Sequence, residues 1–591
     1  MKRYIYICVA LTFFLASACQ KLERDIDTTV GQDEVFSKES YTKNRLSALY
    51  ADLPSGFLEV DGAMLASATD EAEHTLETSD IQLFNIGSWN PNLNPDNPWS
   101  KYFKAIRNAN LFLENSDSVD LDRYKNDPSQ QTLYFNKITE IKRWKYEARF
   151  LRAFYYFELI KRYGGVPIIT KALSRDDDFV GIQRDSLDKC VRFIKSECDS
   201  VLGASIVING VRSTLIPYKY ADAELGRVTK GAALALKAKV FLYAASDLWN
   251  TPTWAGSYAQ PHLISMQTNV ERSVRWDSAQ RVAKQVIDLP GTSYALHSSY
   301  TDLFKTDQSY KNYEHIFVRR GDNTNDFEKA NFSIGFENGK SGTTPTENLV
   351  DAYEVIDGTT GAAVAFDWNN PTHVTNIYNF GATGTRRDPR LNANIIVNNT
   401  TYKSRTMEIW EGGIDGKGID LATKTGYYLK KFLDDGLNIA SGLDKKSVHG
   451  WPLMRLADVY LWYAEALNES NPGHADVLIY LNNVRKRISV AMPVVTGGKT
   501  QSQIRDIIRH ERQVELAFEG HRFWDVRRWM IAPVTLGASI SGVKIVKSGT
   551  NFQYTLIPEV EKRVFEPKMY FYPIPQMELL KMSSWSQNPL W

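Results

Sequence analysis

Acidic residues gather in one short stretch of the chain, Asp70-Glu71-Ala72-Glu73-His74. Glycoside hydrolysis uses a pair of carboxyl groups, one as acid and the other as base or nucleophile. Positions in a sequence do not set the distance between two side chains, so the stretch alone does not predict an active site. A surface glycoside hydrolase stays an open but disfavoured alternative.

Other strings that suggest catalysis lack a required residue. His510-Glu511 begins a zinc-protease helix, but Val514 stands where the second histidine is needed. Gly498-Lys499-Thr500 ends like a phosphate loop, but Pro493 replaces its first glycine. We therefore predict no enzyme, no cofactor and no metal centre; several Asp-rich turns are compatible with structural calcium, but none is diagnostic.

Cys19 has the setting of a lipid-attachment site. Lys2 and Arg3 precede an apolar run from Ile5 to Ala16, and Ala16-Ser17-Ala18-Cys19 leads directly into a polar segment. The run is too short to span a hydrocarbon core of about 30 Å, so it is typical of a cleaved signal. We expect residues 1–18 to be removed and Cys19 to carry acyl chains that anchor the protein to a membrane.

Bulk composition limits the partners. The 591-residue chain has a net charge of +1, which provides no field for nucleic acid binding. Its 14 Trp and 30 Tyr can build a core or offer flat rings to a ligand. Cys190 and Cys198 lie about 12 Å apart if their segment is helical, which is too far for a disulfide. Without neighbouring His they also make a poor zinc site.

Amphipathic helices dominate the chain. The apolar positions from Leu456 to Leu467 follow helical spacing, Asn471-Pro472-Gly473 interrupts it, and a second stripe follows from Val477. Residues 453–490 therefore form a predicted helical hairpin of about 35 residues, the length of a tetratricopeptide-type unit. Four more helices are predicted over residues 147–163, 230–248, 276–289 and 504–529. The charged side chains of the last segment are expected to pair on and between packed helices.

Loops separate these helices. Residues 250–272 and about 321–450 are rich in Gly, Asn, Thr and Pro, with short β-like runs such as 393–397. Long irregular segments in a compact protein are usually functional. We therefore expect the ligand site on loops that a rigid helical frame supports.

Five ordered blocks carry a family resemblance. They begin with Trp99 to Asn110, continue through Glu147 to Pro167 and Gly226 to Ala233, and close with Arg455 to Ala466 and Glu511 to Trp529, before a final Tyr572-Pro573-Ile574-Pro575. Together with Cys19 they strongly resemble the SusD/RagB family of Bacteroidetes outer-membrane lipoproteins.

The resemblance implies a mainly α fold, in which tetratricopeptide-like helical pairs carry long loop-rich insertions and a few short β-hairpins. It divides the chain into an N-terminal region, residues 19–225, and a C-terminal region, residues 226–591. It also implies a non-catalytic, outward-facing lipoprotein of the outer membrane that binds an oligosaccharide and delivers it to a SusC-like TonB-dependent transporter.

Sugar rings require an exposed aromatic face beside hydrogen-bonding groups. The loop from Gly87 to Asn92 fits that requirement, and the resemblance points to Trp89 as its stacking ring, with Asp70 and Asn92 as hydroxyl partners. The loop-rich region offers further candidates: Trp368, Arg386, Arg387, Tyr402 and Trp410. Four tryptophans within the helical blocks are expected in the core: Trp99, Trp144, Trp462 and Trp524.

Two alternatives to glycan delivery stay open. The protein could chiefly gate the transporter and bind peptide or another non-sugar nutrient, with its aromatic residues serving the interface. The other alternative is the glycoside hydrolase already mentioned. The identity of the glycan does not follow from the sequence, because flat stacking rings are generic.

Overall fold

The structure is a computed structural model that describes residues 31–174, 176–291, 294–305, 309–337, 339–440, 443 and 445–591. The predicted signal peptide and the predicted lipidation site, Cys19, lie outside the described residues. Among the helices described, none is long and apolar enough to cross a membrane.

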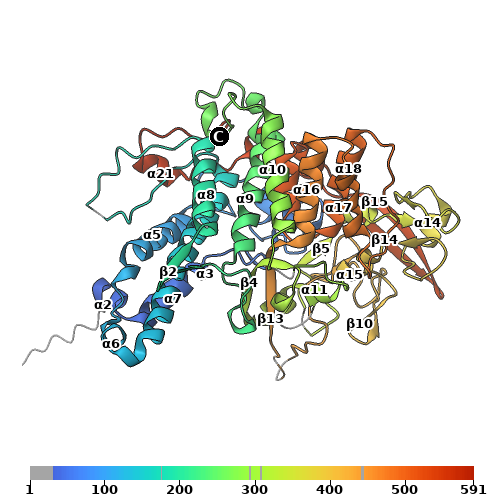
Figure 1. Cartoon of the computed structure of the whole chain (residues 1–591). Coiled ribbons are helices and arrows are strands. Elements are labelled where there is room, and N and C mark those ends of the chain that lie inside the picture. The colour runs from blue at the N-terminus through green and yellow to red at the C-terminus, as the bar shows by residue number, and fades with distance from the viewer. Residues whose placement is uncertain are drawn as a thin grey trace, which may run out of the picture.

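Long helices form one layer of the molecule, side by side in Figure 1. They are α5 (Trp99–Asn115), α7 (Gln131–Tyr163), α8 (Leu187–Leu202), α9 (Lys230–Ala245), α10 (Arg272–Ile287), α16 (Leu456–Ser470), α17 (Ala475–Arg485) and α18 (Gln501–Glu515). Each packs against a neighbour in an antiparallel manner typical of helical pairs, α7 on α8, α9 on α10 and α16 on α17. The predicted mainly α scaffold of helical pairs is confirmed, including the hairpin over residues 453–490.

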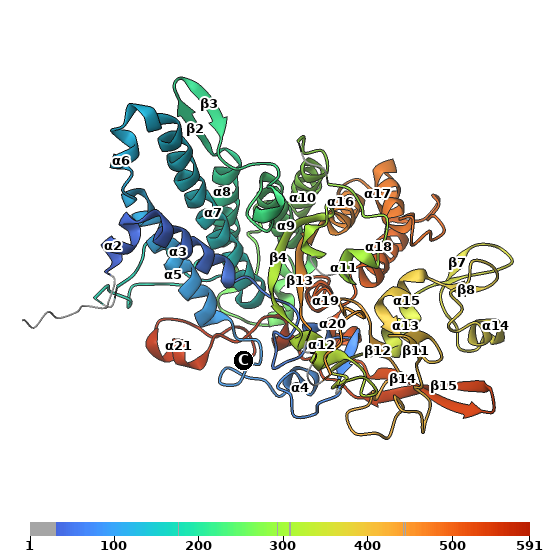
Figure 2. The same cartoon turned by 90° about the horizontal axis from the view of Figure 1, so that it is seen from below.

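Shorter helices connect and cover this layer. They are α2 (Gln32–Ser37), α3 (Glu39–Ala51), α4 (Gln82–Asn85), α6 (Asp122–Lys125), α11 (Asp302–Lys305), α12 (Asp326–Asn331), α13 (Glu347–Ala352), α14 (Pro371–Thr375), α15 (Pro389–Asn394), α19 (Arg522–Arg528), α20 (Ala532–Thr535) and α21 (Gln576–Lys581). Most of those that follow residue 300 lie beside the loop-rich part of the chain, away from α7 and α8 (Figure 2).

Local sequence sets the helix ends. Thr500 and Gln503 form a capping box at the start of α18. At the end of α7, Gly164 has a φ of 72°, and a Cβ there would lie 2.3 Å from the Leu263 carbonyl oxygen. Glycine therefore lets the chain turn against a neighbouring backbone.

The prediction of one helix over residues 504–529 is wrong. The segment forms α18 and α19, separated by residues 516–521. Phe518 and Gly520 take left-handed φ values of 63° and 74° there, which a continuous helix does not permit. The apolar spacing survives the break because both helices bury their apolar residues in the same core.

Two long antiparallel ladders accompany the helices. Strand β4 (His315–Thr324) pairs with β13 (Ser447–Arg455). This pairing brings the two ends of the loop-rich segment together. Strand β14 (Ile540–Ser548) pairs with β15 (Asn551–Glu561). The second ladder is longer than the short hairpins expected from the sequence.

The remaining strands are short. Their pairings are β1 (Ala72–His74) with β5 (Thr343–Pro345), β2 (Ser205–Ile208) with β3 (Val211–Thr214), β6 (Val355–Ile356) with β7 (Ala363–Val364) and β8 (Arg386–Arg387), β9 (Ile395–Ile396) with β12 (Tyr428–Leu429), and β10 (Thr401–Tyr402) with β11 (Arg405–Thr406). The strand predicted within residues 393–397 is present as β9.

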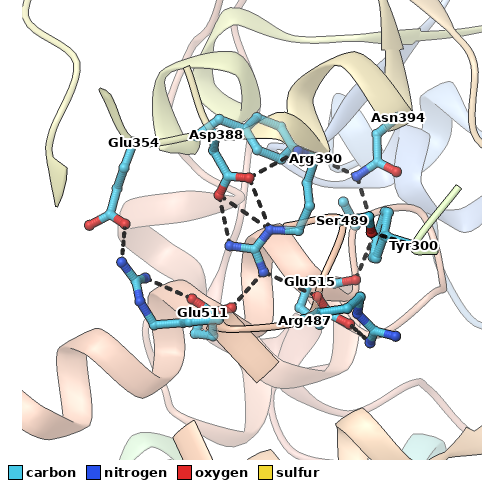
Figure 3. A network of polar contacts seen from close by, with 12 residues as sticks. Tyr300, Glu354, Asp388, Arg390, Asn394, Arg487, Ser489, Glu511 and Glu515 are labelled. Carbon is cyan, nitrogen blue, oxygen red and sulfur yellow. Dashed lines mark hydrogen bonds and ion pairs between the residues drawn. The ribbon is translucent and has the colours of Figure 1, made fainter. Parts of the chain in front are cut away.

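A buried ionic network joins the loop-rich segment to the helices (Figure 3). Arg390 of α15 contacts Asp388 at 2.7 Å and Glu511 of α18 at 2.5 Å, and it also reaches Glu515. Arg485 of α17 binds the other oxygen of Glu511 at 2.9 Å. Burial opposes ionisation of Glu511, but the two arginines outweigh it and lower its pKa to about 2.

The network continues toward β13. Arg455 contacts Glu314 at 2.8 Å, Glu515 at 2.9 Å and Glu519 at 2.7 Å, and Arg487 binds Glu314 and Glu515. All of these side chains are buried. The expectation that the charged residues of the 511–528 segment pair within the packed helices is thus confirmed for Glu511, Glu515 and Glu519.

Removing one arginine from this network should destabilise the fold strongly. Arg390→Ala leaves Glu511 and Glu515 short of a buried partner, and we expect a loss of about 3–5 kcal/mol in the free energy of unfolding. Arg281→Ala is the control, because Arg281 is 62% exposed and pairs with Asp277 on the surface of α10; its cost should stay below about 0.5 kcal/mol. Urea-induced unfolding measures the free energy of unfolding of both variants. Equal losses in the two variants would contradict the importance of the buried network for stability.

Candidate functional site

Trp89 does not offer an exposed face, so the expectation of an accessible stacking ring there is wrong. Its side chain is 2% exposed. It packs edge-to-face against Phe84 at 5.0 Å, Tyr572 at 5.2 Å and Trp591 at 4.7 Å between ring centroids. Of these two tryptophans, Trp591 is the more exposed and is half-buried.

The two predicted partners of Trp89 differ in accessibility. Asp70 is buried, and both its carboxylate oxygens accept hydrogen bonds from Arg522, at 2.8 and 2.7 Å. Its hydrogen-bonding capacity toward a sugar hydroxyl is therefore largely used. Asn92 is exposed, and its backbone N–H donates to the Asn90 side chain at 3.0 Å, which holds the turn.

Three other predicted residues lie in one small lobe, built from the sheet β7-β6-β8 and α14. Arg387 of β8 is buried and lies 4.3 Å from the ring centre of Phe366. Phe366 contacts Trp368 edge-to-face at 5.4 Å. Trp368, Phe366 and Arg386 are half-buried. The lobe therefore combines two partly accessible rings with a guanidinium group.

Arg387 fixes the base of this lobe. Its guanidinium donates to the carbonyl groups of Tyr353 at 3.0 Å and Ile377 at 3.2 Å, and also to that of Val350. These bonds tie β8 to α13 and to the segment after α14. Arg387 is thus inaccessible to a ligand, and its guanidinium packs against the Phe366 ring.

A buried carboxyl pair lies beside the same lobe. Burial raises the pKa of Glu347 well above its ordinary value, and the Asp351 carboxyl raises it further. Burial also raises the pKa of Asp351. Tyr427 donates to Glu347 at 2.6 Å and Tyr378 contacts the Tyr427 hydroxyl at 2.8 Å. Burial and the neighbouring carboxyl group therefore favour the protonated form of Glu347.

Tyr402 and Trp410 lie apart from that lobe. Tyr402 is 3% exposed and packs against Phe336 at 5.6 Å, so the expectation of an accessible ring there is wrong. Trp410 is 9% exposed and lies against Phe552 of β15 at 5.3 Å, with the Lys547 ammonium 4.1 Å from its ring centre. Both rings serve packing in this structure.

Two family models match the chain. The model described as the SusD family matches residues 313–591. The model described as "Starch-binding associating with outer membrane" matches residues 27–242. The chain belongs to the SusD/RagB family. The resemblance of the five sequence blocks is thereby confirmed.

Individual relatives agree with the family. SusD-like protein P2 of Formosa agariphila is 22% identical over 496 residues, which cover 83% of this chain and 79% of that protein. A SusD-like protein from Bacteroides fragilis has 25% identity and a TM-score of 0.75, with 95% of this chain and 98% of that chain covered. A SusD-like carbohydrate binding protein of the same organism has 23% identity and a TM-score of 0.71, over 93% and 99% of the two chains.

The tryptophans of the SusD-family blocks are confirmed as core residues. Their exposed fractions are 4% for Trp99, 2% for Trp144, 1% for Trp462 and 7% for Trp524. Cys190 and Cys198 form no disulfide, and both are buried. Within the described residues, no group of three or more His, Cys, Asp or Glu side chains is placed to hold a metal ion.

Sequence reasoning missed one surface, a cleft of 540 Å³ beside α5. Its lining includes the apolar side chains of Phe103, Ile106 and Phe179 and the basic side chains of Arg107 and Lys171. Phe179 is 41% exposed. The residues that line the cleft come from α5 and from a segment distant in the sequence, which the Arg107 side chain joins to α5 by donating to the Leu173 carbonyl at 2.9 Å.

The acidic stretch that suggested hydrolysis is buried. Glu71 is 1% exposed and Glu73 is 0% exposed, so a glycan on the surface does not reach them. Burial, and after it the Asp70 carboxylate, raise the pKa of Glu71 to about 8. Burial also raises the pKa of Glu73 to about 7. These carboxyl groups belong to the interior of the fold.

The proton on Glu71 predicts a pH dependence of stability. Between its ordinary pKa near 4.5 and the folded value of about 8, the folded state keeps a proton that the unfolded state loses, so stability falls as pH rises. Glu71→Gln removes the titrating carboxyl group and its contribution to the pH dependence. From pH 5 to pH 8 the free energy of unfolding of the variant should therefore rise by on the order of 2–4 kcal/mol relative to that of the native chain. Urea unfolding at both pH values measures it.

The matched control for that experiment is Glu77→Gln in the same loop, because the Glu77 side chain is 79% exposed. It should leave the pH dependence as it is. A native chain and Glu71→Gln variant with the same slope against pH would show that Glu71 is ionised in the folded protein.

Proposed function

We propose that this protein is a non-catalytic, surface-exposed glycan-binding lipoprotein that delivers an oligosaccharide to a SusC-like TonB-dependent transporter in the outer membrane. The proposal rests on family membership, since similar chains are described as a SusD-like carbohydrate binding protein and a laminarin-binding SusD-like protein. The second family model has a description that also refers to starch binding and the outer membrane.

The observation that favours a particular surface is the pair of partly accessible rings Trp368 and Phe366, in the same lobe as Arg386 of β8. A sugar ring presents a face of C–H groups that packs on an aromatic ring, and hydroxyl groups that accept from a guanidinium. Trp368 and Arg386 are accessible in part, whereas Trp89, Tyr402 and Arg387 are not. We therefore place glycan capture on the lobe of β6, β7, β8 and α14.

Burial of the acidic stretch supports the non-catalytic part of the proposal. Hydrolysis requires two carboxyl groups on either side of the scissile bond. Asp70 is held by Arg522, and Glu71 and Glu73 are covered by protein. A binding role needs none of these groups in contact with the ligand.

Trp368→Ala should weaken glycan binding about tenfold or more, because it removes the stacking face. Trp368→Phe keeps a flat ring and should lose less. Trp585→Ala is the matched control, since Trp585 is also half-buried but lies near α21, at the opposite side of Figure 1 from α14. Affinity electrophoresis against a panel of polysaccharides measures all three, followed by calorimetry on the glycan that binds.

Each contrary outcome has a distinct meaning. Loss of binding in a Phe179→Ala variant, with Trp368→Ala unaffected, would move the site to the cleft beside α5. No glycan binding by the native chain would favour the transporter-gating alternative with a non-sugar nutrient. Shortened glycan products after incubation with the native chain would favour a hydrolase.

Membrane attachment has its own test at Cys19. Cys19→Ala removes the only thiol at which the proposed acyl anchor forms, and diacyl attachment is what makes membrane binding durable. We expect the native chain in the outer-membrane fraction, labelled by a fatty-acid probe, and the variant unlabelled. An unlabelled native chain, or an equally labelled variant, would contradict lipidation at this residue.

A further inference from the structure

A polar cavity lies within the helical layer, away from the loop lobe. It measures 390 Å³ and lies between α10, α16 and α18, which are neighbours in Figure 1. Small-molecule sites occupy about 300–1,000 Å³, so this volume suits a ligand of roughly one sugar residue better than an extended chain. Its charged lining is Arg272, Arg505, Arg509, Asp247, Glu465 and Glu469.

The three carboxylates of the lining are not all available to its three arginines, because they already accept hydrogen bonds from particular partners. Glu465 already forms a bidentate pair with Arg528, at 2.5 and 2.7 Å, and it also accepts from the Trp529 indole. Arg505 takes both oxygens of Glu469 at 2.6 Å. Arg272 takes Oδ1 of Asp247 at 2.5 Å. The lining is balanced in formal charge, three arginines against three carboxylates, but each carboxylate already has another cation as its close partner.

Arg509 is the arginine left without a full partner. Its Nη2 lies 3.5 Å from Oδ2 of Asp247, which is longer than a strong charge-assisted hydrogen bond. Its Nε is buried and has no hydrogen-bond acceptor among the described residues. Burial lowers the pKa of Arg509, as expected for a cation without adequate compensation.

Aromatic rings hold the guanidinium groups in place. Arg509 lies 5.1 Å from the ring centre of Trp529, and Arg272 lies 5.4 Å from that of Trp276. Stacking on a fixed indole restricts the arginine side chain before any ligand binds, which reduces the entropy lost on binding. A planar, oriented guanidinium is the group that recognises a carboxylate through two parallel hydrogen bonds.

We propose that this cavity binds the carboxylate of an acidic sugar residue, with Arg509 as its principal partner. The inference rests on the proposed function for the choice of a sugar as ligand, and Oδ2 of Asp247 then provides an acceptor for a hydroxyl group. The cavity is a second site, distinct from the Trp368 lobe, and it selects charged sugar residues over neutral ones.

Calorimetry of the full chain with galacturonate and with galactose tests the inference. We expect galacturonate to bind about tenfold or more tightly than galactose, since a charged hydrogen bond that replaces an unpaired donor contributes at least that factor. Arg509→Gln should abolish this preference, and Arg509→Lys should retain part of it. Arg281→Gln, on the exposed face of α10, is the matched control and should keep the preference.

Several results would overturn the inference. They are equal affinity for the two sugars, an undiminished preference in Arg509→Gln with an unchanged melting temperature, or an acetylated aspartate peptide that binds as tightly as galacturonate. Trp368→Ala separates this site from the proposed function. In this variant we expect loss of neutral-glycan binding with the galacturonate preference intact. Galacturonate binding by a native chain that binds no neutral glycan would contradict the glycan site proposed at the Trp368 lobe and leave this inference standing.

Discussion

The buried contacts among Arg390, Arg455, Glu511 and Glu515 are the constraint on which the arrangement of this molecule depends. Glu511 and Glu515 lie on α18, and their partners come from the loop-rich segment and from β13. Several charges placed out of water cost a large desolvation energy unless each has well-oriented partners. The loop-rich segment therefore docks on the helices in the position that pairs these four charges. A different position would leave buried charges without partners.

This docking gives the loops the rigidity that a binding surface needs. Asp388 and Arg390 follow β8 directly, so the strand that carries Arg386 and Arg387 is fixed within a few residues of the ionic network. Arg387 then supports Phe366, and Phe366 contacts Trp368. A chain of contacts thus runs from the helical layer to the partly exposed rings, and it holds them before a ligand arrives.

The helical frame could be predicted from the sequence because apolar spacing records helices directly, as at α16 and α17. The break between α18 and α19 could not, because the apolar stripe continues through it and only the backbone at Phe518 and Gly520 reveals the turn. The burial of Trp89 could not be predicted for another reason. The rings that cover it, Tyr572 and Trp591, come from about 500 positions further along the chain, and local sequence does not record such contacts.

Hydrogen–deuterium exchange with and without a bound oligosaccharide tests the central claim most directly. If a helical frame holds the loop lobe to grip the glycan, protection should increase at residues 355–387 and stay unchanged along α16 and α17. Protection at residues 87–93 or 169–179 instead, with none in the lobe, would contradict the account.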